Sequence, residues 1–266
     1  MPTKTTRTPA PASESVSSTA GLPRYVEIAN ELREHIESAD LAPHTLLPSE
    51  RELSETYRVS RMTARQALTL LENEGYVYRR PPRGTFVAEP RVLFRLGSFS
   101  AEVARAGRHP SARLLWAETT APSPAVQDAL GLAAGEQVHA LQRLRLADAE
   151  PLAIETTYFP ATLTPGLLQQ PLEGSLWTLL RDNYGVVPSN ARATLQFIVT
   201  DDRSASLLRL RSAAPGILQT RKTYDQSGRC VEFARDIYRA DRAAFEFDAI
   251  VQPPALIEGA VAGGGR

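Results

Sequence analysis

The sequence has little of the chemistry that marks a secreted domain, a membrane protein or a typical enzyme. It contains one cysteine, Cys230, which excludes an intrachain disulfide and makes a reducing cytoplasm the expected compartment. No apolar run approaches the roughly 20 residues that a membrane helix needs. Residues 1–22 are rich in Thr, Ser, Ala and Pro and lack the apolar core of a secretory signal, so we expect a disordered tail there.

Charge and histidine content exclude further classes. The 30 basic and 30 acidic side chains give a net charge of zero, so composition alone does not indicate nucleic acid. No nucleophile elbow, phosphate-binding loop or dinucleotide fingerprint is present, and the four histidines have no metal-ligand spacing: His35, His44, His109 and His139. We therefore expect no cofactor and no catalytic metal.

Residues 23–88 have the pattern of three short helices followed by a β-hairpin. Ser49 and Glu52 form a capping-box pattern at the start of the second helix. Ser60 is the expected N-cap of the third helix, and Gly75 its end. Its expected inward residues are Met62, Ala64, Ala67, Leu68 and Leu71. Strand patterns at 76–80 and 85–88 flank a turn, and this order predicts a winged helix-turn-helix.

The basic charge in this region is concentrated after the second helix. Residues 58–84 carry six arginines and two acids. The first turns of the third helix, which reach deepest into the major groove in such a motif, carry arginines that can bond guanine bidentately. The candidate DNA contacts on the two helices and the wing are Arg51, Arg61, Thr63, Arg65, Arg83 and Gly84. The alternative is that these arginines only solvate a surface helix.

The remainder of the chain has different secondary-structure patterns. Residues 89–97 lack a clear period and are expected to form a linker. Strand patterns outnumber helical ones between 98 and 248, which favours an α+β domain with a largely antiparallel sheet. Residues 249–266 end in a glycine-rich run and are expected to form a second tail.

Several charged residues in the second region could bind an anion. Arg143 and Arg145 are two apart, so on a strand they share one face and repel each other unless an anion lies between them. Ser100 and Ser175 stand at expected helix starts, which also favour anions. The alternative is internal salt bridging, either of the arginine pair with Glu155 or of Glu232 with Arg235.

Two resemblances bring these features together. The segment 47–87 resembles the winged-helix domain of GntR-family bacterial transcription factors, through LPSER (47–51), VSR (59–61), TARQAL (63–68), EG (74–75) and RGTFV (83–87). Residues 98–248 resemble the UTRA effector domain of the HutC branch, which has a chorismate-lyase-like α+β fold. The motifs are SFS (98–100), RLR (143–145), PLAIE (151–155), GSLW (174–177) and EFARDIYRAD (232–241). Ala64 departs from the larger apolar residue usual in the family.

The UTRA resemblance implies a regulator, in most members a repressor. It would bind a palindromic operator in double-stranded DNA as a homodimer, away from any membrane, and be released by a small anionic metabolite such as a sugar phosphate. The implied effector site comprises Phe99, Ser100, Arg143, Arg145, Glu155, Ser175, Trp177, Glu232 and Tyr238. Trp177 replaces a frequent tyrosine and cannot accept a hydrogen bond, and Arg192 is a further possible contact. A carboxylate effector, an effector-independent DNA-binding protein and a chorismate-lyase-like enzyme remain the alternatives.

Overall fold

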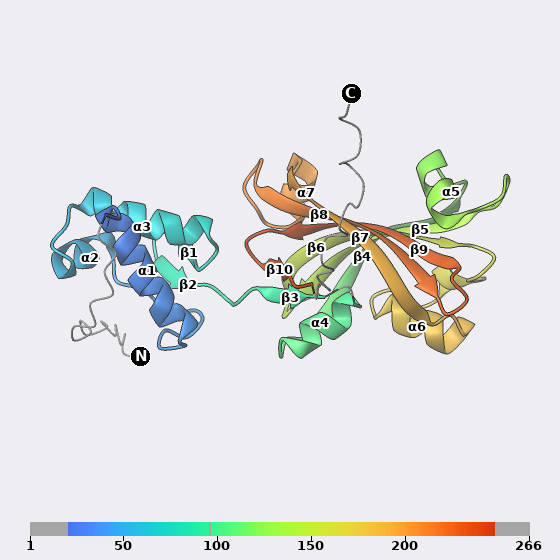
Figure 1. Cartoon of the computed structure of the whole chain (residues 1–266), viewed down its shortest axis with the longest axis horizontal. Helices are drawn as coiled ribbons and strands as arrows, with labels where there is room; N and C mark the ends of the chain where they lie inside the picture. The colour runs from blue at the N-terminus through green and yellow to red at the C-terminus, as the bar shows by residue number, and fades with distance from the viewer. Residues whose placement is uncertain (1–20, 96, 248–266) are drawn as a thin grey trace, which may run out of the picture.

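The computed structural model describes residues 21–95 and 97–247, so most of each expected tail, 1–20 and 249–266, lies outside the described residues. The N-terminal part contains α1 (Arg24–Glu37), α2 (Glu50–Thr56), α3 (Arg61–Asn73) and a hairpin of β1 (Val77–Arg80) and β2 (Gly84–Val87). Figure 1 shows these elements as a separate group beside the larger sheet domain. The arrangement is the winged helix-turn-helix that the sequence predicts.

Capping side chains fix where the two helices of the motif begin. The Ser49 hydroxyl accepts from the Glu52 amide at 3.2 Å, and the Glu52 carboxylate accepts from the Ser49 amide at 2.8 Å, which confirms the capping box. The Ser60 hydroxyl accepts from the Thr63 amide at 3.1 Å at the start of α3. These bonds satisfy amide groups that a helix start otherwise leaves without partners.

One face of α3 forms the centre of the small core. Ala64, Ala67, Leu68 and Leu71 are buried and share a core with Ile28, Leu32 and Leu53 of the other two helices. Met62 was expected to point inward, but its side chain is 59% exposed, so that expectation is wrong. The buried positions follow the spacing i, i+3, i+4, i+7 from Ala64, and a residue two positions earlier lies on the opposite side of the helix.

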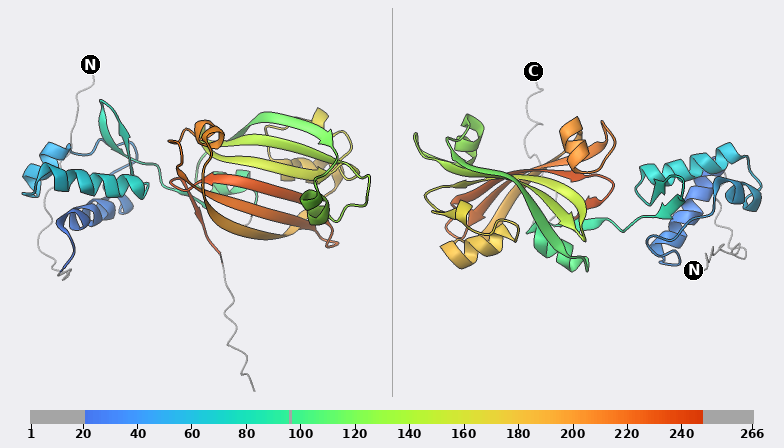
Figure 2. Two further views of the ribbon diagram at one scale, coloured as in Figure 1. Left: turned by 90° about the horizontal axis from the view of Figure 1, so that it is seen from above. Right: turned by 180° about the vertical axis from the view of Figure 1, so that it is seen from behind.

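The second part is built on a six-stranded antiparallel sheet in the order β4-β5-β6-β9-β8-β7. Helices α4 and α6 lie on one face and α5 and α7 on the other, as Figures 1 and 2 agree. We call the side of α4 and α6 the inner face. The strands are β4 (Pro110–Thr120), β5 (Val138–Ala147), β6 (Glu150–Pro160), β7 (Pro188–Val199), β8 (Pro215–Asp225) and β9 (Cys230–Arg239). The helices are α4 (Phe99–Arg105), α5 (Pro124–Leu130), α6 (Leu176–Tyr184), α7 (Asp202–Leu207) and the short η1 (Leu167–Gln169). The fold class is α+β, as predicted.

The connection between the two parts is not wholly irregular. Within the expected linker, β3 (Val92–Phe94) pairs in parallel with β10 (Ala243–Phe245), so that part of the linker prediction is wrong. Val92 and Phe94 are buried against Phe99 and Tyr238, which anchors the strand in the core of the sheet domain. The segment that joins the two parts is therefore shorter than the sequence suggested.

Direct contacts also link the two parts. The Arg242 guanidinium donates to the carbonyl of Gly75, just after α3, at 3.3 Å. The Arg91 guanidinium donates to the neighbouring carbonyl of Glu74. Gly75 has φ of +80°, and a Cβ there would lie 2.7 Å from the Asp241 carbonyl oxygen, so a glycine is required. The end of α3 therefore rests against the end of the sheet domain.

The residues that the structure describes contain neither a helix suited to cross a membrane nor a cluster suited to hold a metal ion. None of the helices in 21–95 and 97–247 has the length and apolar character needed to span a bilayer. The same residues contain no cluster of three or more His, Cys, Asp or Glu side chains positioned to hold a metal ion.

Candidate nucleic-acid interface and effector site

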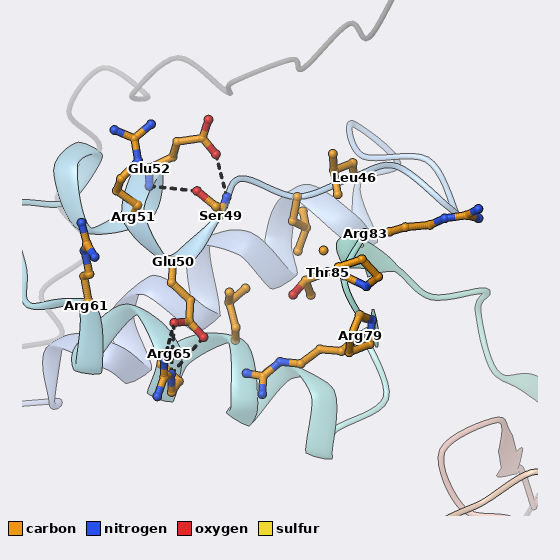
Figure 3. A pocket seen from close by; sticks show the side chains of 15 residues that line it. Leu46, Ser49, Glu50, Arg51, Glu52, Arg61, Arg65, Arg79, Arg83 and Thr85 are labelled. Carbon is orange, nitrogen blue, oxygen red and sulfur yellow. Dashed lines mark hydrogen bonds and ion pairs between the residues drawn. The ribbon is translucent and has the colours of Figure 1, made fainter.

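An open cleft of about 700 Å³ lies between α2, α3 and the tip of the hairpin (Figure 3). Its lining contains five arginines: Arg51, Arg61, Arg65, Arg79 and Arg83. Arg61 and Arg65 are exposed, not sealed inside the domain. The predicted arginines thus meet at one concave surface, with Arg79 as an addition that the candidate set did not include.

Neighbouring side chains restrain several of these arginines. The Arg65 guanidinium donates to the Glu50 carboxylate through Nε and Nη2, at 2.9–3.1 Å. The Arg79 guanidinium donates to the Thr69 hydroxyl at 2.9 Å. The Arg51 guanidinium makes one longer contact, 3.3 Å, to Glu55. Arginine side chains held in this way lose less conformational freedom when they bind a ligand.

The remaining predicted contacts lie near the same cleft. The Thr63 hydroxyl is 2.9 Å from the Ser60 hydroxyl, at the first turn of α3. Gly84 lies in the lining with φ of +117°, and a Cβ there would meet the Leu46 side chain at 2.8 Å. A side chain at position 84 would therefore strain the backbone, and the tip of the Leu46 side chain would have to move.

The second predicted site is a buried polar cluster on the inner face of the sheet. Its nine members lie on β5, β6, β8 and β9: Arg143, Arg145, Glu155, Thr157, Gln219, Arg221, Thr223, Glu232 and Asp236. Cross-strand register places Arg143 opposite Glu155, Glu155 opposite Asp236, and Asp236 opposite Gln219. A single polar row thus crosses four strands.

The arginine pair shares one internal counter-ion, Glu155. The Glu155 carboxylate accepts from Arg143 Nε at 2.6 Å and from Arg145 Nη1 at 2.9 Å. The salt-bridge alternative is therefore present for this pair. Although burial alone would raise the pKa of Glu155, the two guanidinium groups hold it near 2. The guanidinium of Arg143 also donates to the carbonyls of Leu172 and Gly174, both at 2.8 Å, which ties the loop before α6 to the cluster.

The two helices on the inner face bring the other predicted residues to the cluster. The Arg145 guanidinium donates to the Ser100 hydroxyl at 3.0 Å and lies over the Phe99 ring, 4.3 Å from its centre. Ser175 is the N-cap of α6, where its hydroxyl accepts from the Thr178 amide. Tyr238 is buried, and burial raises the pKa of its hydroxyl. All nine predicted effector residues thus lie on or beside the inner face.

Glu232 occupies the far end of the cluster and has a full set of donors. Its carboxylate accepts from Trp177 Nε1 at 3.0 Å, from Thr223 at 2.7 Å and from Thr157 at 3.1 Å, and it pairs with Arg221 at 3.3 Å. The alternative pairing with Arg235 is wrong. Arg235 is exposed on the outer face, because residues three apart on a strand point to opposite sides.

Five members of the cluster, on β6, β8 and β9, were not predicted from the sequence: Thr157, Gln219, Arg221, Thr223 and Asp236. Among the residues that the structure describes, four buried polar atoms of the cluster have no hydrogen-bond partner: Arg145 Nε, Gln219 Oε1, Arg221 Nε and Asp236 Oδ1. The signal was present, since Gln219, Arg221 and Thr223 alternate along a strand pattern and so share one face. Arg192 does not join them, because it pairs opposite Lys222, on the outer face.

The charge balance of the cluster depends on Asp236. Burial raises the pKa of Asp236 to about 8; Arg221 opposes this change, and Glu155 and Glu232 reinforce it. Burial alone would lower the pKa of Arg221, but Glu232 and Asp236 raise it overall. The cluster therefore contains three guanidinium groups, two glutamates and one aspartic acid whose carboxyl group is biased toward its protonated form by burial.

Two family models match the chain. The model described as bacterial regulatory proteins of the gntR family covers residues 24–87, and the UTRA domain model covers residues 105–244. The chain belongs to the GntR family. It is a DNA-binding transcriptional regulator whose second part is a UTRA domain, as the resemblance implied.

Curated relatives and a solved structure agree with this assignment. The transcriptional repressor NagR of Bacillus subtilis is 34% identical, over 87% of this chain and 96% of its own. The repressor PhnF of Mycolicibacterium smegmatis is 36% identical, over 74% of this chain and 82% of its own. The crystal structure of PhnF covers 85% of this chain and 100% of its own, with a TM-score of 0.61 at 30% identity. These GntR relatives are regulators, not enzymes.

Proposed function

We propose that this GntR regulator is a dimeric repressor that leaves its operator when the buried cluster binds a small anionic metabolite. The observation that carries the proposal is the pair of unpartnered Nε groups on two buried guanidiniums, Arg145 and Arg221. An anion can accept charge-assisted hydrogen bonds from these donors, which are stronger than the bonds that a neutral ligand would accept.

The same cluster constrains the rest of the effector. The Gln219 and Asp236 side chains each leave one oxygen unpartnered among the described residues, on strands three and two places away from that of Arg143. A ligand that spans the row would satisfy them with hydroxyl or amine donors. Sugar phosphates combine both features, and hydroxylated or amino carboxylates are the second class. The relative MngR of Escherichia coli, 27% identical, is named as repressor of a mannosyl-D-glycerate system, a substrate that combines a sugar with a carboxylate.

Binding of an anion would rearrange the loop before α6. The donors of Arg143 are committed to Glu155 and to the carbonyls of Leu172 and Gly174. An anion that draws on this guanidinium competes with those carbonyls and releases the loop. The released loop shifts the balance between two arrangements of the domain, of which one holds the DNA-binding part in register.

The exposed edge of β7 is the proposed dimer contact. This 12-residue strand lies at one edge of the sheet, and Phe197 and Val199 are 90% and 70% exposed. Two such edges joined antiparallel would continue the sheet across the dimer and remove an exposed edge. A twofold dimer presents two recognition helices, which explains the expected palindrome.

In each copy the cleft would contact DNA through Arg61, Arg65 and the wing around Gly84, with Arg51 and Thr63 on the phosphates. The open, arginine-lined shape supports this assignment, because phosphates attract the arginines and α3 fits the major groove. Cytoplasmic localisation follows from this role in gene regulation.

The test starts from the full-length protein. A random duplex pool gives its preferred operator, and release is then screened with sugar phosphates and carboxylates by fluorescence anisotropy. We expect release by at least one anion, loss of that release in Arg145→Ala and Arg221→Ala, and normal release in Arg181→Ala, an exposed arginine on α6. Release that survives in both cluster variants, or release only by neutral compounds, would refute the anion site.

A further inference from the structure

In the cleft between α2, α3 and the hairpin tip, the oppositely charged side chains of Glu50 and Arg65 form an ion pair. Glu50 is the first residue of α2, and Arg65 lies in the second turn of α3. The carboxylate meets the guanidinium along its Nε–Nη2 edge, with Nε–Oε2 at 3.0 Å and Nη2–Oε2 at 2.9 Å. Figure 3 shows this pair between Arg61 on one side and Arg79 on the other.

The pair leaves one edge of the guanidinium open. Arginine has five N–H groups in a planar fork. Glu50 takes the Nε–H and one Nη2–H, so the second Nη2–H and both hydrogens of Nη1 remain outside this contact. That remaining edge presents two parallel donors, the arrangement that matches O6 and N7 of guanine. Because Glu50 holds one edge of the Arg65 guanidinium, Arg65 can make this contact with little further loss of rotamer freedom.

Stability of the domain does not account for the pair. The side chains of Arg65 and Glu50 are 57% and 31% exposed, and ion pairs at that exposure contribute little to folding. A carboxylate in an arginine-lined cleft also repels phosphate. It therefore weakens binding to DNA of every sequence, and its presence needs a gain in discrimination to offset that loss.

We infer that Glu50 is a specificity-determining positioning residue, which holds Arg65 with its open edge toward a guanine and lowers the affinity of the cleft for other DNA. This inference rests on the proposed contact of the cleft with the major groove. Glu50 acts through Arg65 and does not itself contact a base.

The experiment compares Glu50→Gln with wild-type full-length protein. The wild type first selects its preferred sequence from a random duplex pool. Binding to that duplex, to each single-base-pair variant and to a random-sequence duplex is then measured by fluorescence anisotropy over a range of KCl concentrations. Glu34→Gln is the matched control, because it removes one exposed carboxylate from α1, outside the cleft lining.

Glu50→Gln should bind the random duplex more tightly, with the slope of log K against log salt steeper by up to about one. Its preference for one guanine should fall about tenfold, the scale of one bidentate contact. Glu34→Gln should retain the wild-type preference. In an Arg65→Ala background, Glu50→Gln should cause no further change in base preference, because the group that it positions is gone.

Three results would overturn the inference. They are an unchanged base preference in Glu50→Gln, an equal loss of base preference in Glu34→Gln, or an equal loss of base preference when Arg65 is already alanine, which would mean that Glu50 reads the base itself.

Should Glu50→Gln unfold at a lower temperature than the wild type, Glu50→Asp replaces it, since aspartate keeps the charge but is one methylene too short to hold Arg65. That variant should lose discrimination without gaining affinity for random DNA. A wild type that selects no sequence would instead refute the proposed function.

Discussion

Replacing Asp236 with asparagine tests the buried cluster most directly. Asp236 is only 2% exposed, and one of its carboxyl oxygens has no hydrogen-bond partner in 21–95 or 97–247. Burial raises the pKa of this carboxyl group from 3.8 to about 8. Asparagine has nearly the same shape and does not ionise, so the substitution removes this proton equilibrium while it keeps the packing.

The sign of the effect follows from proton binding. Between about pH 4 and pH 8 the unfolded chain has an ionised Asp236, whereas the folded chain keeps the proton. The folded state binds more protons, so the free energy of unfolding falls as the pH rises through this window. One proton corresponds to about 1.4 kcal/mol per pH unit. From pH 5 to pH 8 the wild type should therefore lose up to about 4 kcal/mol that the asparagine variant keeps.

Urea unfolding followed by tryptophan fluorescence measures this difference in the relevant domain. The chain has two tryptophans, Trp116 on β4 and Trp177 on α6, and both lie in the UTRA domain. The Glu155 carboxyl group, with its pKa near 2, affects stability only below about pH 4.5 and stays outside the window. Asp128→Asn, an exposed position on α5, is the control and should give a flat difference from wild type.

The decisive quantity is the difference in unfolding free energy between the Asp236→Asn variant and the wild type. It should increase with pH from 5 to 8. A difference that stays constant over that range would mean that Asp236 is ionised in the folded protein. The assignment of a protonated Asp236 to the buried cluster would then be wrong.

Three other substitutions test separate parts of the structure. Glu155→Gln leaves Arg143 and Arg145 without a buried counter-ion and should lower the unfolding free energy of the UTRA domain by about 3–5 kcal/mol in the urea assay, and a loss below 1 kcal/mol would contradict the buried pairing. Ser49→Ala removes the capping box and should destabilise the winged helix by about 1 kcal/mol, visible as a lower melting temperature in circular dichroism, whereas an unchanged transition would show that the cap adds nothing. Phe197→Glu should shift the protein toward monomer in sedimentation velocity with little change in tryptophan-monitored stability, and an intact dimer would exclude the β7 edge as the contact.

The DNA-binding part could be predicted closely from the sequence because its signals are local. A capping box, a serine N-cap and a terminal glycine each act within a few residues, and together they mark where the helices begin and end. The prediction that Met62 on α3 points inward is wrong for a geometric reason. An apolar residue next to a helical stripe joins it only at the correct angular offset.

The partners in the buried cluster could not be chosen from the sequence, because they depend on strand order. β9 lies between β6 and β8 in the sheet, so Asp236 joins the row of Glu155 across 81 positions of sequence. The parallel pair of β3 and β10 joins segments about 150 residues apart, each only three residues long. Such short strands leave no periodicity to detect, and β3 was therefore assigned to a linker.

The C-terminal end of α3 contacts the sheet domain at Gly75, so a rotation of the DNA-binding part about this contact would move the whole helix. Gly75 contacts Arg242 and Asp241, while Arg61 lies at the far end of the 13-residue helix, roughly 20 Å away. A tilt of about 10° at the Gly75 contact moves the far end by roughly 3.4 Å, which equals the rise of one base pair. A change near Arg242 too small to alter the fold could thus displace the reading residues by a whole step along the duplex.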